Sequence, residues 1–143
     1  MDNSSREPKP LPGPEDIQAL LEFLPIFEKP DFVFGEEVGL EKQDDGTITL
    51  PHYTMSLEAR RFRRVLHDCG FIRSFDWGKW KHEAVRYMDE PSSLETADLD
   101  TLCKLLTLHV RQERFCDGHL ASMYECGHLT AILRQMVTIL DRI

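Results

Sequence analysis

"LDTLCKLLTLHV", residues 99–110, is the stretch that decides the fold of this chain. Its apolar residues recur at helical spacing and extend around most of the helix circumference, which predicts a central, buried helix. Only a narrow face, with Lys104, Thr107 and Arg111, is expected to stay polar. The remaining elements are therefore expected to pack around this helix.

The rest of the chain predicts further helices and one hairpin. Apolar stripes at helical spacing run through residues 14–24, 56–69, 76–88 and 132–143. Pro25 is expected to end or bend the first of these helices, Ser56 and Asp76 to cap the second and third, and Gly70 to end the second in the left-handed conformation. Between residues 32 and 53 strand-forming residues replace this pattern, and Asp45-Gly46 is a strong signal for a tight turn. We expect an α+β fold, mostly α, in which about five helices pack with one small β-hairpin that covers one end of the core.

The length fits one domain with a short N-terminal extension. Residues 1–13 hold three of the eight prolines and show no periodicity, which predicts a disordered N-terminal arm. Residues 14–143 are expected to form a single globular domain. The sequence shows no secretory signal and no long apolar segment, and its four cysteines are spread among helical patterns, which together favour a cytoplasmic protein with free thiols.

Charge is distributed unevenly along the chain. Residues 1–50 carry 4 Lys or Arg against 12 Asp or Glu, whereas residues 51–90 carry 8 against 6. The whole chain has a net charge of −8, so binding to nucleic acid is disfavoured. The basic excess is concentrated in "EARRFRR", residues 58–64, which we interpret as the solvated side of an amphipathic helix.

The best candidate site lies in "VRQERFCDGHLASMYECGHL", residues 110–129, between two apolar helical stretches. Arg111 and Arg114 lie near the end of the central helix, where a guanidinium group can cap carbonyls, pair with a carboxylate or bind an anionic ligand. Asp117 is expected to cap the short helix that follows, and His119 lies beside it. We name Arg111, Arg114, Asp117 and His119 as candidate binding residues.

Metal binding and catalysis are weaker interpretations of the same segment. Cys116, His119, Cys126 and His128 are the residue types that bind zinc, but their spacing matches no common motif, so no metal site and no cofactor are predicted. The sequence contains no GxSxG, P-loop or HExxH motif, so no catalytic residue is assigned. His109, on the central helix, is interpreted as a hydrogen-bonded core histidine.

"RQERFCDGHLA", followed by "ECG" and "ILRQM", together with the earlier "GFIRSFDWGKW" and "LEFLPIF", resembles an uncharacterised prokaryotic family of unknown function, family 6508. The resemblance extends from about residue 14 to the C-terminus. It implies a single-domain, cytoplasmic protein from a prokaryote. It implies no activity, cofactor or catalytic residue.

Three functions from different classes follow from these observations. The first is a non-enzymatic binding or regulatory module, with the polar cluster at Arg111–His119 as its pocket and the Arg60–Arg64 face as a docking surface. The second is a small enzyme that acts on an anionic substrate through the Arg, Cys and His side chains of residues 111–128. The third is a zinc-stabilised domain. The expected partner is a protein or a small anionic ligand, and the apolar final helix leaves a homodimer open.

Overall fold

A computed structural model describes residues 10–143 of the chain. Its helices are α1 (Pro14–Leu21), α2 (Leu24–Phe27), α3 (Leu57–Asp68), α4 (Trp77–Asp89), α5 (Leu99–Glu113), α6 (His119–Glu125) and α7 (His128–Asp141), with a 3-10 helix η2 (Pro91–Thr96) before α5. Its strands are β1 (Gly35–Val38), β2 (Glu41–Lys42), β3 (Ile48–Thr49) and β4 (His52–Met55). The mostly helical α+β class is confirmed. The described residues contain seven α-helices instead of about five.

The first helical segment divides at a proline. Pro25 was expected to end or bend the first helix, and α1 does end before it. A second helix of 4 residues, α2, then begins with Pro25 in its first turn, a position that needs no N–H partner. The helix count is therefore higher than expected partly because a proline that ends one helix can begin the next.

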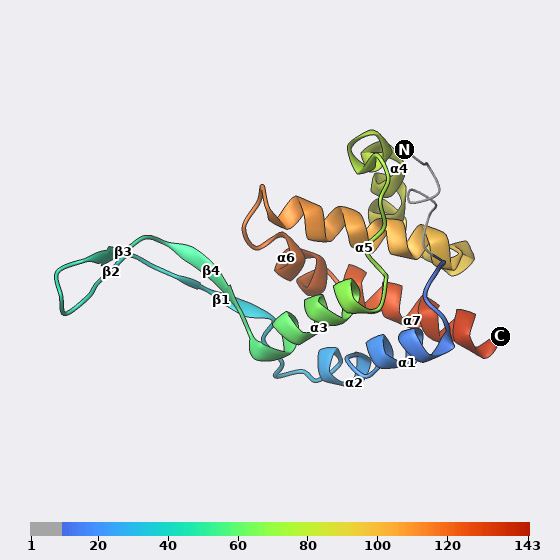
Figure 1. Cartoon of the computed structure of the whole chain (residues 1–143), viewed down its shortest axis with the longest axis horizontal. Coiled ribbons are helices and arrows are strands. Elements are labelled where there is room, and N and C mark those ends of the chain that lie inside the picture. Colours follow the sequence, from blue (N-terminus) through green and yellow to red (C-terminus); the bar gives the residue numbers. More distant parts are fainter. Residues whose placement is uncertain (1–9) are drawn as a thin grey trace, which may run out of the picture.

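Helix α5 lies at the centre of the helical body, as its sequence predicted (Figure 1). All residues from Leu105 to Val110 are buried, and α4, α6 and α7 pack against the helix. Thr107, which was expected to be on a polar face, is fully buried. Its hydroxyl accepts a hydrogen bond from the Arg73 backbone N–H (2.8 Å) and lies 2.8 Å from the Cys103 carbonyl oxygen, to which it can donate. A hydroxyl with both partners can be buried without the cost of a lost hydrogen bond.

Local signals at the helix ends are confirmed. The Ser56 hydroxyl accepts a hydrogen bond from the Ala59 N–H at 3.2 Å, and the Asp76 carboxylate accepts one from the Lys79 N–H at 3.2 Å. Gly70 follows α3 with φ of +82°, the left-handed conformation that ends many helices. These features mark both ends of α3 and the start of α4.

The hairpin forms at the expected turn but does not cover the core. Strand β1 pairs antiparallel with β4, and β2 pairs antiparallel with β3 beyond them, with the turn at Asp45-Gly46. The two ladders form one long ribbon, residues 35–55, which we call the arm, and it projects away from the helical body (Figure 1). Residues 36–52 contribute no side chain to the core, so the expectation that the hairpin packs over one end of the helices is wrong.

Part of the N-terminal segment that was predicted to be disordered, residues 1–13, lies outside the described residues. Residues 1–9 are in that part, whereas residues 10–13 lead directly into α1. The Gly13 N–H donates to the Asp16 carboxylate at 3.0 Å, and the Pro10 carbonyl accepts a hydrogen bond from the Arg73 guanidinium at 3.1 Å. No helix among residues 10–143 is long and apolar enough to cross a membrane.

Candidate functional site

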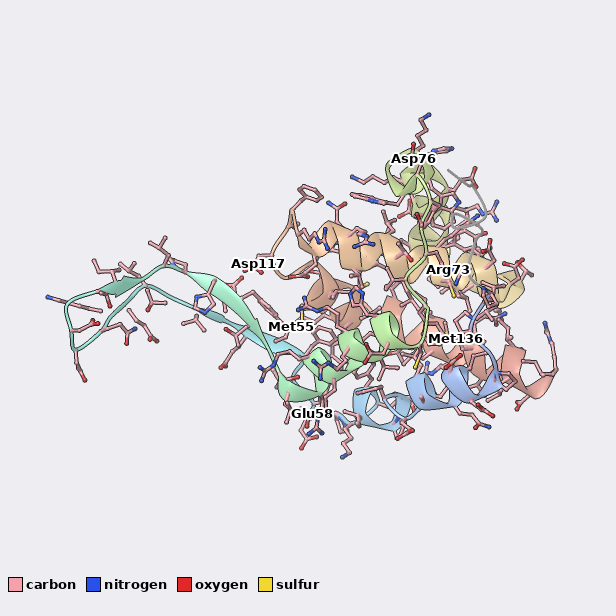
Figure 2. All side chains as sticks on the ribbon, in the orientation of Figure 1. Met55, Glu58, Arg73, Asp76, Asp117 and Met136 are labelled. Carbon is pink, nitrogen blue, oxygen red and sulfur yellow. The ribbon has the colours of Figure 1, made fainter. Side chains whose placement is uncertain are left out.

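A cavity of about 830 Å³ lies where α3, the end of α5 and the root of the arm meet. We call it the arginine basin. Figure 2 shows Met55 at the root of the arm and Asp117 in the turn after α5, on the side that faces the arm. The basin is lined by Tyr53, Met55, Leu57, Arg60, Arg63, Arg64, His67, Asp68, Val110, Glu113, Arg114 and Asp117.

Helix α3 supplies most of the positive charge of the basin because of its amphipathic spacing. Phe62 and Leu66 are buried against the core, which turns the opposite side of the helix outward. Positions 60, 63, 64 and 67 are separated by three or four residues and therefore share one outward face. This face was interpreted from the sequence as merely solvated. The fold places it over a cavity, opposite Arg114 from α5.

The arginine side chains of the basin have no acidic partner within residues 10–143. The ion pairs of that part of the chain join Lys79 to Asp76, His82 to Glu83, Lys104 to Asp100 and Arg134 to Glu28. None involves an arginine of the basin, and none of these guanidinium groups donates a hydrogen bond to another described residue. The four guanidinium groups are therefore available to an external anion.

Two basin carboxylates are already engaged by backbone N–H groups. The Glu113 carboxylate accepts hydrogen bonds from Gly118 N (2.9 Å) and Leu120 N (2.8 Å), at the positive end of α6. The Asp117 carboxylate accepts one from Tyr53 N at 2.7 Å and so joins the turn after α5 to the arm. These bonds reduce the capacity of both acids to neutralise the arginines.

Asp117 does not cap α6 as expected. The cap position is Gly118, whose φ of +89° is the left-handed conformation that glycine adopts without strain. A Cβ at Gly118 would come within 3.4 Å of the Tyr53 ring, so the turn also packs closely on the arm. Glu113, five residues before the cap, performs the capping role that was assigned to Asp117.

The pKa of His67 is lowered by burial and by the positive charge of nearby arginines. Partial burial lowers the pKa of its imidazole, and the nearby charges of Arg111, Arg63 and Arg114 lower it further. His67 is therefore neutral at pH 7 and can donate or accept a hydrogen bond. Arg111 is half-buried and does not line the basin, but its charge also lowers the pKa of His67.

The structure separates His119 from the other predicted binding residues. Its Nε2 lies 3.0 Å from Nδ1 of His109, and the His109 ring meets the His128 ring edge-on with centroids 5.0 Å apart. The three imidazoles come from α5, α6 and α7, which follow one another through short turns. His109 is a buried, hydrogen-bonded core histidine, as predicted.

All three imidazoles of this cluster are neutral at pH 7. Burial lowers the pKa of His128 to about 4, with His119 adding to the effect. Burial, then His128 and His119, lower the pKa of His109 well below its usual value, and burial lowers that of His119. Nε2 of His109 and Nε2 of His128 are buried without a hydrogen-bond partner among the described residues. Protonation of His109 or His128 would therefore place a positive charge in a buried position, which is unfavourable.

The residues proposed from the sequence as zinc ligands do not form a centre. Cys116 and Cys126 are free and exposed. Within the described part of the chain, no group of three or more His, Cys, Asp or Glu side chains is placed to hold a metal ion.

The fold and this site define a small helical domain with a projecting β-ribbon and, at the root of the ribbon, a basin whose arginines form no ion pair within residues 10–143. The chain belongs to a family of unknown function (DUF6508), whose family model matches residues 12–142. This match confirms the resemblance drawn from the sequence. No curated protein and no solved structure matches the chain.

Proposed function

We propose that this protein is a non-enzymatic binding module whose arginine basin holds an anionic group of its ligand. The observation that carries the proposal is the set of four guanidinium groups, Arg60, Arg63, Arg64 and Arg114, that line one cavity without an acidic partner in residues 10–143. A guanidinium group offers a planar pair of donors that matches a carboxylate or a phosphate.

The apolar lining and the neutral His67 support the same function. Met55, Leu57 and Val110 give the basin a partly apolar wall, which limits the hydration of a bound anion and strengthens its attraction to the arginines. His67 supplies a neutral hydrogen-bonding group beside them. The ligand class is therefore a carboxylate- or phosphate-bearing group with adjacent apolar atoms.

The binding function is favoured over the enzyme alternative by the position of two side chains. An enzyme acting through the 111–128 segment needs Cys116 or His119 beside Arg114 on an open cavity. Neither residue lines the basin, and the His119 Nε2 faces His109.

The test is calorimetric titration of the full chain with pyrophosphate and with a short poly-glutamate peptide. We expect binding that weakens as salt increases and that weakens at least tenfold in Arg63→Ala and in Arg114→Ala. Arg61→Ala is the matched control, because Arg61 lies on the same helix and is exposed but does not line the basin. Thermal unfolding should be unchanged in all three variants, since these exposed side chains form no ion pair and donate no hydrogen bond within residues 10–143. Equal binding by Arg63→Ala, Arg114→Ala and the unaltered protein would refute the proposal.

A further inference from the structure

The arm has the composition of a contact surface. Leu40, Ile48 and Leu50 are 66%, 58% and 72% exposed, although the exposure of large apolar side chains to water is unfavourable. A two-stranded ribbon is only marginally stable in water by itself, and both of its edges carry unpaired backbone groups. The arm extends clear of the helical body in Figure 1, so the helices cover neither the apolar side chains nor the backbone edges of the arm.

The arm is also strongly acidic. Residues 35–55 hold five Asp or Glu and one Lys, a net charge of −4 with His52 neutral. The Asp45 carboxylate is engaged in the turn, where it accepts hydrogen bonds from the Thr47 N–H and hydroxyl. Glu36, Glu37, Glu41 and Asp44 are exposed and take part in none of the ion pairs of residues 10–143.

One chain therefore carries unpaired acidic side chains along the ribbon, with Glu41 and Asp44 near its tip, and an arginine-rich basin at its root. The basin lies at the root of the arm, and the acidic turn lies at its tip. Figure 1 shows the ribbon running from its root beside α3 outward to β2 and β3, away from α3 and α5. Because residues of α3 and of the end of α5 line the basin, the tip is not placed to reach the basin of its own chain. At about 3.3 Å per residue, the ten residues from root to tip span about 33 Å.

From these observations we infer that the partner of the basin is the acidic arm of a second copy of this chain. In a two-fold symmetric dimer, every contact between residue i of one copy and residue j of the other is matched by a contact between j of the first copy and i of the second. Two arms that lie side by side in opposite directions place each tip at the root of the other. Glu41 and Asp44 of one copy then face Arg60 and Arg64 of the other.

The same arrangement covers the apolar side chains. Leu40, Ile48 and Leu50 lie along the arm between root and tip, and in the dimer they are buried between the two ribbons. Attraction between the acidic tip and the arginines sets the register of the arms, and apolar burial adds free energy of association. This inference rests on the proposed function, because it names the anionic group that occupies the basin.

The test is sedimentation velocity of the full chain over a range of concentrations at low and high salt. We expect a concentration-dependent dimer that dissociates at high salt. An arm variant, Glu41→Lys with Asp44→Lys, and a basin variant, Arg60→Glu with Arg64→Glu, should each be monomeric. Far-UV circular dichroism should show both variants folded, because all four side chains are exposed.

Mixing the two variants separates a specific contact from a general loss of association. In a mixed dimer the Lys-bearing arm meets the Glu-bearing basin, and the unaltered arm meets the unaltered basin, so an equimolar mixture should dimerise. The matched control, Arg61→Glu with Arg86→Glu, changes charge by the same amount outside the basin and should stay dimeric.

Each remaining outcome decides the inference. A chain that is monomeric at every concentration, or variants that dimerise as the unaltered chain does, would overturn it. If the monomeric chain still binds pyrophosphate through Arg63 and Arg114, the basin function stands and only the identity of its partner is wrong. If it neither dimerises nor binds pyrophosphate or poly-glutamate, both proposals fall.

Discussion

Acidification should destabilise this protein through His128, and the size of the effect follows from its burial. His128 is the first residue of α7, and its ring lies against the His109 ring. The residue is only 6% exposed. Its pKa is about 4 in the folded protein, against about 6.5 for an unperturbed imidazole. Between these values the unfolded chain binds a proton at His128 that the folded chain does not, so stability falls as the pH falls.

The free energy lost follows from the two pKa values. Relative to pH 7.5, His128 alone should lower the free energy of unfolding by about 2 kcal/mol at pH 5 and by about 3 kcal/mol at pH 4. Nothing is lost at this site above pH 7, because both states are then neutral. In a His128→Leu variant this part of the loss should disappear, and the parts that come from His109, His119 and His67 should remain.

The assay is urea unfolding followed by tryptophan fluorescence at pH 7.5, 6, 5 and 4. The matched control is His82→Leu, because the His82 side chain is 78% exposed on α4. The control should lose stability with pH as the unaltered protein does, whereas His128→Leu should lose about 3 kcal/mol less between pH 7.5 and pH 4. If His128→Leu and the unaltered protein lose the same free energy, the imidazole is not held neutral by burial and the reasoning is wrong.

Three further variants, with Leu50→Ala as a control, test the packing of the helical body. Thr107→Val leaves the Arg73 N–H without its buried acceptor and should lower the free energy of unfolding by about 1–3 kcal/mol, measured by urea unfolding. Glu113→Ala removes the acceptor at the start of α6 and should cost about 1–2 kcal/mol, with faster hydrogen exchange of the Leu120 amide as a local readout. Leu106 is 1% exposed, so Leu106→Ala leaves a cavity in the core and should lower the free energy of unfolding by about 2–5 kcal/mol. Leu50→Ala, on the arm, should change monomer stability by less than about 0.5 kcal/mol. Equal effects of these two variants would contradict the assignment of the core.

Features set by neighbouring residues could be predicted from the sequence. The caps at Ser56 and Asp76, the turn at Asp45-Gly46 and the burial of α5 each depend on a few adjacent side chains or on one periodic stripe. The left-handed glycine after α3 belongs to the same group. These predictions succeeded because the physical cause lies within one or two helical turns.

Features that depend on tertiary packing could not be predicted in the same way. The sequence indicated that Thr107 is polar but not that the Arg73 backbone lies within hydrogen-bonding distance of it. It indicated a hairpin but not its direction, because an exposed ribbon and a covering ribbon share the same alternation of side chains.

The candidate site was predicted in part. Arg114 and Asp117 do line the basin, but Arg63 joins them only because the fold places α3 and the end of α5 on the same cavity. His119 was grouped with them by proximity in sequence, and α6 instead directs it toward His109. The presence of His109, His119 and His128 on three consecutive helices joined by short turns was the signal that could have identified the second cluster.

The independence of the arm from the core has a consequence for how this family can diverge. Residues 36–52 are free of the packing demands that restrict substitution in α5 and α7. Selection on folding therefore has little effect on those positions, and whatever touches the ribbon governs which amino acids persist there. Comparing arm sequences across the family should consequently show which constraints other than folding act on the ribbon, while the helical body records the constraints of its fold.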